Sequence, residues 1–364
     1  MKILLDNIIY SNVQNGGVSN AWFELSKYLL NQTDDEVNFI QESNDYLNFY
    51  RKQLNIPENQ IISNGKLFNL PTRILPFEYN SDEKFIYHSS YYRGLKGAKN
   101  KIEVTTIHDF THNYYFPYLK KIIHNSLKYP ALKRANGIVC ISKNTYADLY
   151  KFCPPKKNQK VEVIYNGVSN DYYNIDKLSL NDETFLKRNR IDGRFLLFIG
   201  SRANYKNFDY VISILNENID LKLVVISGGN LTTGELKLFK NKSFDRLIFL
   251  DSASNNELNI LYNTAFSLVY PSSYEGFGIP VVEAMRAGCP VIGLENPVMR
   301  EISKKAAQTL NKLNINEFDI IRNNLSNKNF RKEIIETGFQ ESQVYSWDKC
   351  SKETHEFYQS LYNQ

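Results

Sequence analysis

Two carboxylates on either side of a glycine-rich turn form the part of the sequence best suited to chemistry. Glu275 and Glu283 are eight residues apart and flank Gly276-Phe277-Gly278-Ile279. The turn follows an apolar run, Phe266–Tyr270, and precedes Pro280, which needs no amide hydrogen in the first turn of a helix. Amides at a helix start bind phosphate or sugar oxygens, and carboxylates accept hydrogen bonds from vicinal hydroxyls. We therefore predict a sugar or nucleotide site facing one pocket; the alternative is a helix whose N-terminal acids only offset its dipole.

A second cluster suited to anions contains Arg202 and Lys206. Both follow the apolar run Phe195–Ile199 and precede a predicted helix. A guanidinium matches the geometry of phosphate oxygens, and an ammonium adds a compact positive charge. A diphosphate leaving group needs such neutralisation because negative charge grows on its oxygen as the bond breaks. The alternative is a solvated loop with two basic residues.

The first half of the chain offers two further candidates at strand ends. The run Val104–His108 delivers His108 and Asp109 to the carboxyl end of a predicted strand, where open α/β sheets bind ligands. Gly16 and Gly17 lie between a strand and a helix, and a Gly-Gly pair allows close approach of a ligand to the backbone. The alternatives are a structural histidine and a plain loop.

Short apolar runs alternate with helical patterns along the chain, which is typical of α/β proteins with parallel sheets. The predicted strands of the first half are Lys2–Leu5, Val37–Ile40, Phe85–His88, Val104–His108, Gly137–Ile141 and Val161–Tyr165. Those of the second half are Phe195–Ile199, Lys222–Ser227, Leu247–Leu250, Phe266–Tyr270 and Pro290–Ile292. Helices are predicted at Ser19–Leu30, Asn207–Asn216, Glu257–Ala265 and Pro280–Ala287, and Ser254 and Glu257 have the spacing of a capping box.

Two such series in tandem predict two doubly wound, Rossmann-like domains. We expect one domain at residues 1–168, a second at residues 169–344 and a terminal helix at residues 345–364. The stretch Ser169–Arg190 has no clear periodicity and is predicted to be irregular.

The segment Tyr270–Pro290 resembles the E-x7-E signature of the retaining GT-B glycosyltransferases, glycosyltransferase family 4 in particular. The resemblance covers nearly the whole chain, including Asn166-Gly167-Val168 and Tyr345-Ser346-Trp347-Asp348. It implies the GT-B fold, in which two Rossmann-like domains face each other across a cleft. Residues 1–168 would then be the acceptor-side domain and residues 169–344 the nucleotide-sugar domain. The helix at residues 345–364 would cross back to the first domain.

The resemblance also implies roles for the candidate residues. Glu283 would hold the ribose hydroxyls, Glu275 would face the donor sugar, and the amides of Gly276, Phe277, Gly278 and Ile279 would contact its hydroxyls and phosphate. Arg202 and Lys206 would hold the diphosphate, although their spacing is R-x3-K where the family has R-x4-K. His108 and Asp109 would lie by the donor sugar, and Gly16 and Gly17 would meet the donor phosphates.

The implied activity is retaining transfer of a hexose from a nucleoside diphosphate sugar to a saccharide, and we expect a lipid-linked acceptor in bacterial O-antigen or capsule synthesis. GDP-mannose or a related GDP-hexose is favoured as donor. A UDP-sugar enzyme and a non-catalytic subunit that binds nucleotide sugars are the alternatives. Because no Asp-x-Asp motif occurs, we expect neither a metal nor another cofactor.

Composition excludes several other classes of protein. A chain with 42% hydrophobic and 23% charged residues is globular, and a net charge of +5 predicts no nucleic-acid partner. No apolar run is long enough to span a membrane, the N-terminus lacks a signal-peptide core, and the four cysteines lack metal-ligand spacing. We expect reduced thiols in a cytoplasmic protein, and contact at the inner face of the membrane is an open alternative.

That contact depends on a helix predicted around residues 114–128. Leu119, Ile122, Ile123 and Leu127 form one stripe, and Lys120, His124 and Lys128 share another face. We favour a surface helix whose stripe packs into the core; the alternative is an interfacial helix on an anionic membrane. Pro130 is expected to kink or end the helix.

Overall fold

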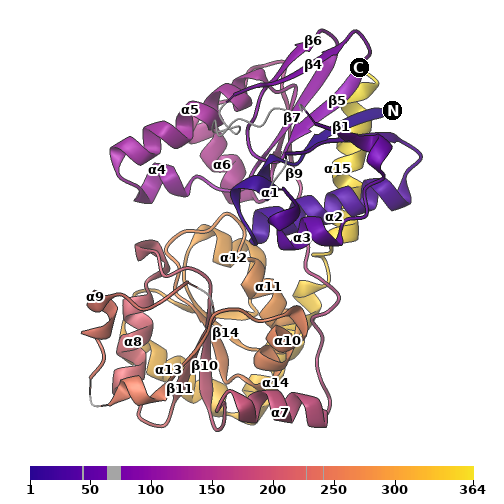
Figure 1. Ribbon diagram of the computed structural model, residues 1–364. Coiled ribbons are helices and arrows are strands. Elements are labelled where there is room, and N and C mark those ends of the chain that lie inside the picture. The colour runs from indigo at the N-terminus through magenta and orange to yellow at the C-terminus, as the bar shows by residue number, and fades with distance from the viewer. Residues whose placement is uncertain (43–44, 64–74, 227, 241) are drawn as a thin grey trace. The chain divides into compact units, whose positions relative to one another are not determined.

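Contacts divide the chain into two α/β units in the computed structural model, which describes residues 1–42, 45–63, 75–226, 228–240 and 242–364. Unit 1 comprises Met1–Gly167 and Ser346–Gln364, and unit 2 comprises Val168–Tyr345 (Figure 1). The chain therefore passes from one unit to the other twice.

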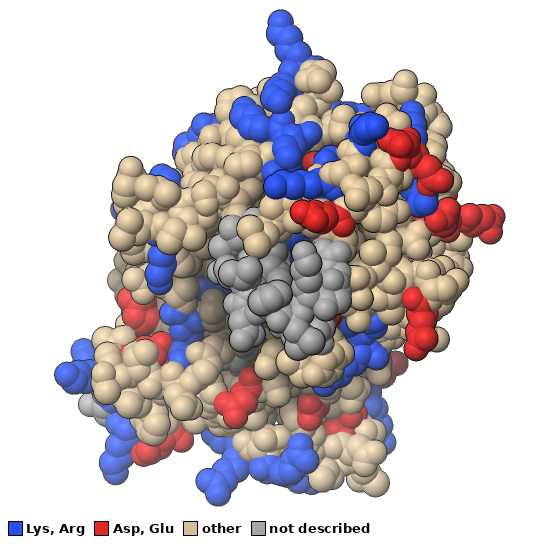
Figure 2. Space-filling model, turned by 45° about the horizontal axis from the view of Figure 1, so that its top comes forward, with Lys and Arg blue, Asp and Glu red and all other residues tan. Residues whose placement is uncertain are grey.

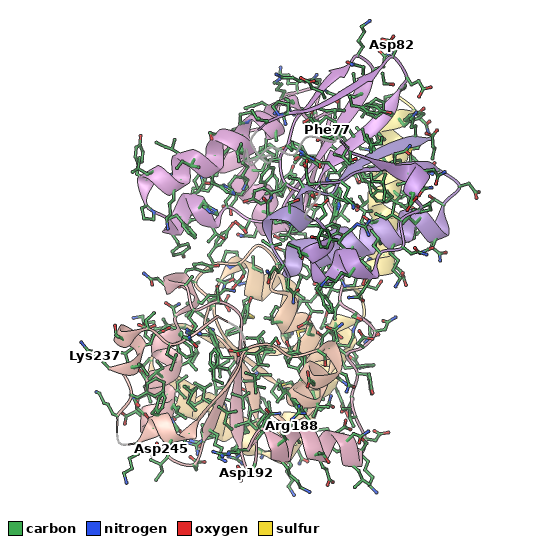
Figure 3. All side chains as sticks on the ribbon, viewed as in Figure 1. Phe77, Asp82, Arg188, Asp192, Lys237 and Asp245 are labelled. Carbon is green, nitrogen blue, oxygen red and sulfur yellow. The ribbon has the colours of Figure 1, made fainter. Side chains whose placement is uncertain are left out.

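Unit 1 contains a seven-stranded sheet in the order β3-β2-β1-β5-β7-β8-β9, in which all neighbours are parallel. Its strands are β1 (Lys2–Asp6), β2 (Glu36–Ile40), β3 (Ile61–Ile62), β5 (Phe85–Ser89), β7 (Lys101–Ile107), β8 (Gly137–Cys140) and β9 (Lys160–Val163). A separate pair joins β4 (Phe77–Ser81) to β6 (Leu95–Ala98). In Figure 3, Phe77 lies on this pair and Asp82 just beyond the end of β4.

The helices of unit 1 include one from the far end of the chain. They are α1 (Ile8–Asn12), α2 (Gly17–Gln32), α3 (Phe49–Gln53), α4 (Thr111–Tyr115), α5 (Tyr118–Arg134), α6 (Lys143–Phe152) and α15 (Trp347–Tyr362). Phe357, Tyr358 and Leu361 of α15 are buried in one core with Trp22 of α2. A Cβ at Gly137 would collide with Phe357 and Leu361, so the glycine allows α15 to lie against β8.

Unit 2 contains a six-stranded parallel sheet in the order β12-β11-β10-β13-β14-β15. Its strands are β10 (Phe195–Ile199), β11 (Lys222–Ile226), β12 (Leu247–Leu250), β13 (Ser267–Tyr270), β14 (Val291–Leu294) and β15 (Ala307–Leu310). Chain order reverses between β10 and β13, and the carboxyl ends of strands at such a point form the ligand-binding crevice of open α/β sheets. The predicted α/β fold with two doubly wound units is confirmed.

Helices surround the sheet of unit 2. They are α7 (Leu180–Arg188), α8 (Phe208–Glu217), α9 (Thr233–Leu236), α10 (Asn255–Thr264), α11 (Ile279–Arg286), α12 (Pro297–Ser303), α13 (Ile315–Ser326) and α14 (Lys328–Ser342). Ser254 and Glu257 form the expected capping box at the start of α10.

Several predicted elements need correction. The stretch predicted to be irregular contains α7, which begins at a capping box of Ser179 and Asp182 and buries none of its residues, so it has no apolar stripe to detect. Pro130 lies inside α5, which continues to Arg134. Most predicted boundaries shift by one or two residues, and Ser227, the expected end of β11, lies outside the described residues.

Arg286, at the end of α11, holds together the two points where the chain enters and leaves unit 2. Its guanidinium donates to the backbone oxygens of Val168, Ser342 and Tyr345 at 2.7–3.1 Å. Next to Val168, a Cβ at Gly167 would collide with the backbone of Ser346 and Trp347. The two crossings of the chain therefore lie side by side.

Basic and acidic side chains both spread over the face drawn in Figure 2. Among the described helices, none has the length and apolarity needed to cross a bilayer. The four cysteines are free thiols, three of them buried.

Candidate functional site

The site in unit 2 is assembled by two loops that follow β10 and β13. Asn207 has the left-handed conformation (φ 52°) and links them, because its side-chain amide donates to the Pro271 oxygen at 2.7 Å and the Ser273 hydroxyl at 2.8 Å. The Ser273 amide donates in return to the Tyr205 oxygen at 2.8 Å. This clamp fixes the position of Lys206 relative to the glycine-rich turn.

Lys206 and Glu275 form an ion pair beside Tyr270, the last residue of β13. The Lys206 ammonium also lies 3.4 Å from the Tyr270 hydroxyl. Burial, followed by Glu275 and more weakly by Glu283, raises the pKa of Tyr270 well above its ordinary value. Both predicted carboxylates therefore lie near one buried phenol.

Glu283 is held inside unit 2 by tyrosines from other segments. The Tyr262 hydroxyl of α10 donates to its carboxylate at 2.8 Å, and Tyr172 supplies a second hydrogen bond. Burial raises the pKa of Glu283 to about 7, against the opposite effect of these two hydrogen bonds. The carboxylate is therefore poised between its charged and neutral forms near neutral pH.

The turn between the carboxylates forms the start of α11. Gly278 is the N-cap residue with φ 92°, a conformation that favours glycine, and Ile279 begins the helix. The Phe277 ring is buried against Tyr345 at a centroid distance of 5.5 Å, so its side chain serves packing and only its backbone remains for a ligand. Gly276 is buried beside it.

Arg202 has a different acidic partner from Lys206. Its Nε donates to Glu235 of α9 at 2.8 Å, and a terminal nitrogen donates to the Asn230 oxygen at 2.7 Å. Burial alone would raise the pKa of Glu235, but hydrogen bonds from Thr232 and Arg202 bring it below its usual value. Gly228 provides space, since a Cβ there would press on the guanidinium. Arg202 is thus oriented, but toward a carboxylate.

The candidate residues of unit 1 lie after β7 and at the start of α2. Burial, with a smaller contribution from Lys128, lowers the pKa of His108 to about 4, so the imidazole is neutral at pH 7. Burial alone would raise the pKa of Asp109, but Lys128 and the Thr111 hydrogen bonds lower it below its usual value. His108 can therefore exchange hydrogen bonds with a ligand, and Asp109 remains charged.

A small cavity of about 40 Å³ lies beside His108. Its lining includes Trp22 and His88, and the His88 ring is held between the hydroxyls of Tyr358 and Thr106. Gly16 and Gly17 are exposed at the start of α2, and Gly16 has φ 153°. Unit 1 thus presents a neutral imidazole, a carboxylate and a helix start.

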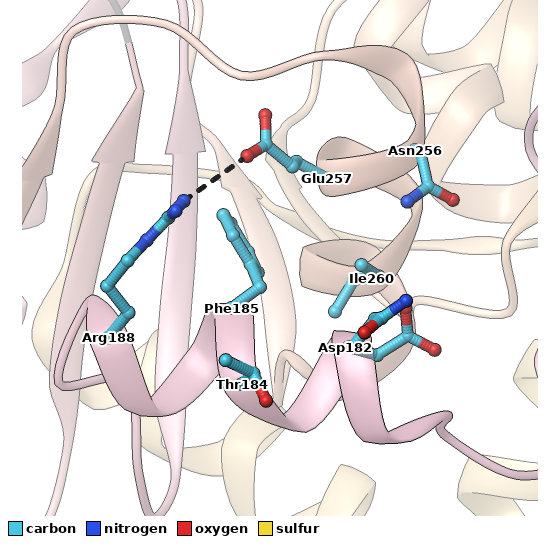
Figure 4. A pocket seen from close by; sticks show the side chains of 8 residues that line it. Asp182, Thr184, Phe185, Arg188, Asn256, Glu257 and Ile260 are labelled. Atoms are coloured by element: carbon cyan, nitrogen blue, oxygen red, sulfur yellow. Dashed lines mark ion pairs between the residues drawn. The ribbon is translucent and has the colours of Figure 1, made fainter.

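A larger hollow of about 230 Å³ lies between α7 and α10, away from the predicted site (Figure 4). Arg188 and Glu257 face each other across it at 3.8 Å. None of the predicted site residues is in its lining.

Several groups that hold the site were not predicted. The motifs do not include Tyr172, Tyr262 and Glu235. The sequence spacing of these residues from Glu283 or Arg202 does not predict that they are in contact. Tyr270 and Lys128 could have been considered, because one ends the strand before the glycine-rich turn and the other lies on a predicted helix.

Comparisons with known proteins agree with this architecture. Residues 15–172 match the family model for glycosyltransferase family 4, and residues 181–341 match the model for glycosyl transferases group 1. The O-antigen chain mannosyltransferase RfbU of Salmonella typhimurium is 29% identical over 219 residues, covering 57% of this chain and 56% of RfbU. The O-antigen biosynthesis glycosyltransferase WclY of Escherichia coli is 27% identical over 311 residues, or 81% of each chain. The match with RfbU thus spans little more than half its length.

Solved structures show the same fold at low sequence identity. Sucrose-phosphate synthase from Thermosynechococcus elongatus has a TM-score of 0.74 and 15% identity, with 100% of this chain and 99% of that one covered. HepE from Anabaena, solved with UDP-glucose, has a TM-score of 0.72 and 16% identity, with 99% and 100% covered.

The two family matches and the likeness to solved structures identify a glycosyltransferase-type protein with the GT-B fold. The chain belongs to the glycosyltransferases that combine a family 4 domain with a group 1 domain, and its relatives include O-antigen mannosyltransferases.

Proposed function

We propose that the protein is a retaining glycosyltransferase that moves a hexose from a nucleoside diphosphate sugar to a saccharide hydroxyl. The observation that carries the proposal is the grouping of Lys206, Glu275 and Glu283 around Tyr270 at the start of α11. A cation and a helix start suit a diphosphate, and two carboxylates suit sugar hydroxyls.

Each group has a part in the proposed reaction. The bond between the sugar C1 and the phosphate oxygen breaks with its electron pair going to the diphosphate, whose charge Lys206 and Arg202 stabilise. The acceptor oxygen bonds to C1 on the same face, and its proton passes to the departing phosphate. Glu275 orients the sugar, Glu283 binds the ribose, and the neutral His108 and charged Asp109 of unit 1 contact the sugar or acceptor.

We favour GDP-mannose or a related GDP-hexose as the donor and a lipid-linked saccharide at the cytoplasmic face of the membrane as the acceptor. The mannosyltransferase and O-antigen names of the relatives support this choice. The test is a thermal-shift panel of GDP- and UDP-sugars, followed by mass analysis of lipid-linked acceptors. Stabilisation by UDP-sugars alone would contradict the GDP assignment, and binding without transfer would favour a non-catalytic subunit.

Replacing Glu283 by alanine is expected to weaken nucleotide binding about 10- to 150-fold, the equivalent of about 1.5–3 kcal/mol for a hydrogen bond to a charged group. Isothermal titration calorimetry with GDP and UDP measures the loss. Glu283→Gln is the matched control for packing, because it keeps an acceptor for the buried Tyr262 hydroxyl. Equal nucleotide affinity in wild type and Glu283→Ala would remove the ribose assignment.

Nucleotide affinity is also expected to rise with pH through about 7. The pKa of Glu283 is raised to about 7 by burial, so the carboxylate, the stronger acceptor, is half formed at this pH and predominates above it. Stability should change the other way: it falls between the ordinary value of 4.5 and about 7, because the unfolded chain ionises first. Glu283→Gln should lack both changes once the titration of the nucleotide phosphate is subtracted.

We also propose that transfer needs no divalent metal, because Arg202, Lys206 and the α11 start supply positive potential for the diphosphate. Transfer is therefore expected to continue in excess EDTA, measured as product by mass spectrometry. Activity that falls to background and returns with Mg²⁺ or Mn²⁺ would overturn this.

A further inference from the structure

One end of unit 1 exposes a group of large apolar and aromatic side chains. These side chains belong to α4 and to the first turns of α5, two helices that lie next to each other in Figure 1. We call this group the α4–α5 surface, and its exposed members are Tyr114, Tyr115, Tyr118, Leu119, Ile122 and Ile123. Leu119 is 73% exposed and Ile123 is 62% exposed. The expectation that the stripe packs into the core is therefore wrong for Leu119, Ile122 and Ile123, whereas Leu127 is half-buried.

The inward side of α5 carries the polar residues Asn125 and Lys128 as well as Ala131 and Leu132. Both polar residues are buried, and the Lys128 ammonium donates to the backbone oxygen of Asp109 and lies 3.5 Å from the centre of the Phe110 ring. His124 stacks on His112 of α4 at a centroid distance of 3.8 Å. A helix on an ordinary protein surface turns its apolar stripe inward, so the first turns of α5 have the reverse of the usual orientation.

The charge of this region has one sign. The chain from Phe110 to Ala147 contains six Lys and Arg residues and no Asp or Glu. Lys120 is exposed at the side of the apolar stripe. The next acid in the chain, Asp148, is buried and accepts a hydrogen bond from Tyr114 at 2.6 Å. An apolar stripe with a lysine beside it, on a segment of the chain that has no acid from Phe110 to Ala147, suits the surface of an anionic membrane.

We propose that the α4–α5 surface docks the protein on an anionic phospholipid bilayer. Leu119, Ile122 and Ile123 enter the boundary between headgroups and acyl chains, and Tyr118 lies at the headgroup level. Lys120 contacts lipid phosphates. The inference deepens the proposed use of a lipid-linked acceptor, since the surface would bring unit 1 to the layer that holds such an acceptor.

Vesicle sedimentation tests the docking without any transfer reaction. Wild type is expected to bind phosphatidylcholine vesicles that contain phosphatidylglycerol, and to bind pure phosphatidylcholine much less. The double variant Leu119→Ser/Ile123→Ser should lose at least about tenfold in partition, because two large apolar side chains no longer leave water. Lys120→Ser should lose about fivefold at low salt and less at high salt.

The matched control is Leu180→Ser/Ile219→Ser in unit 2, where the two side chains are 81% and 80% exposed. It should bind vesicles like wild type. The proposal is overturned if wild type binds neither vesicle or binds both equally, or if the control loses as much as the test variant. It is also overturned if light scattering shows a wild-type dimer that Leu119→Ser/Ile123→Ser separates, since the surface would then be a protein interface.

GDP and UDP affinities of the two double variants are expected to equal those of wild type. Nucleotide binding reports on the proposed function and vesicle binding on the α4–α5 surface, so the failure of either is recognised separately.

Discussion

Glu275→Gln is expected to lower kcat by about 10²- to 10³-fold while nucleotide affinity changes much less. The Glu275 carboxylate lies beside Lys206 at the start of α11. In the proposed reaction the bond between the sugar C1 and the phosphate oxygen breaks there. Glutamine keeps the size of the side chain but removes its charge and its ion pair with Lys206. Steady-state kinetics of sugar transfer, together with calorimetry of nucleotide binding, separate the two effects.

Glu295→Gln provides the matched control for this variant. Glu295 is also in unit 2 and pairs with an arginine, Arg300, at 2.5 Å, but it is not one of the groups around Tyr270. Its replacement should leave kcat within about twofold of wild type, as for other surface substitutions. A kcat for Glu275→Gln as close to wild type as that of the control would refute the role of Glu275.

Arg93→Met is expected to lower the free energy of unfolding by about 3–5 kcal/mol, because it leaves buried charge without its partner. The Arg93 guanidinium donates to the Asp6 carboxylate at 2.8 Å and also pairs with Glu42. Asp6 is fully buried, at the carboxyl end of β1, and accepts a further hydrogen bond from Tyr87 at 3.1 Å. Urea denaturation followed by circular dichroism measures the change.

The exposed Arg300 allows a control with the same change of side chain. Arg300→Met is expected to alter stability by less than about 1 kcal/mol, since surface ion pairs contribute little. If Arg93→Met unfolds at the same urea concentration as Arg300→Met, the buried pair does not stabilise unit 1 as argued.

The sequence predicted many of the strands and helices that bury an apolar face, but it missed α12, α13 and β15. The runs at Phe195–Ile199 and Phe85–His88 match β10 and β5 because these strands are almost fully buried. The helix α7 was missed because it depends on capping and buries no side chain. The predicted orientation of α5 was wrong. Lys128 and His124 make contacts with residues outside α5, and these contacts decide which side of the helix faces inward.

The candidate site was only partly accessible from the sequence. Motif spacing identified Lys206, Glu275 and Glu283 as candidates, since each follows a strand end or lies near a helix start. It could not find the groups that hold them, such as Tyr262 for Glu283 and Glu235 for Arg202. Those partners come from other helices and meet the motif residues only when the sheet of unit 2 has formed.

The contacts around Arg286 and Gly167 also show how unit 2 is inserted into the chain of unit 1. Unit 2 is one continuous stretch, Val168–Tyr345, whereas unit 1 is interrupted by it. Because Gly167 lies against the backbone of Ser346 and Trp347, the ends of the interruption already touch. In topological terms unit 2 is an insertion into unit 1, and a direct splice of residue 167 to residue 346 would restore an unbroken unit 1 with α15 in its own core.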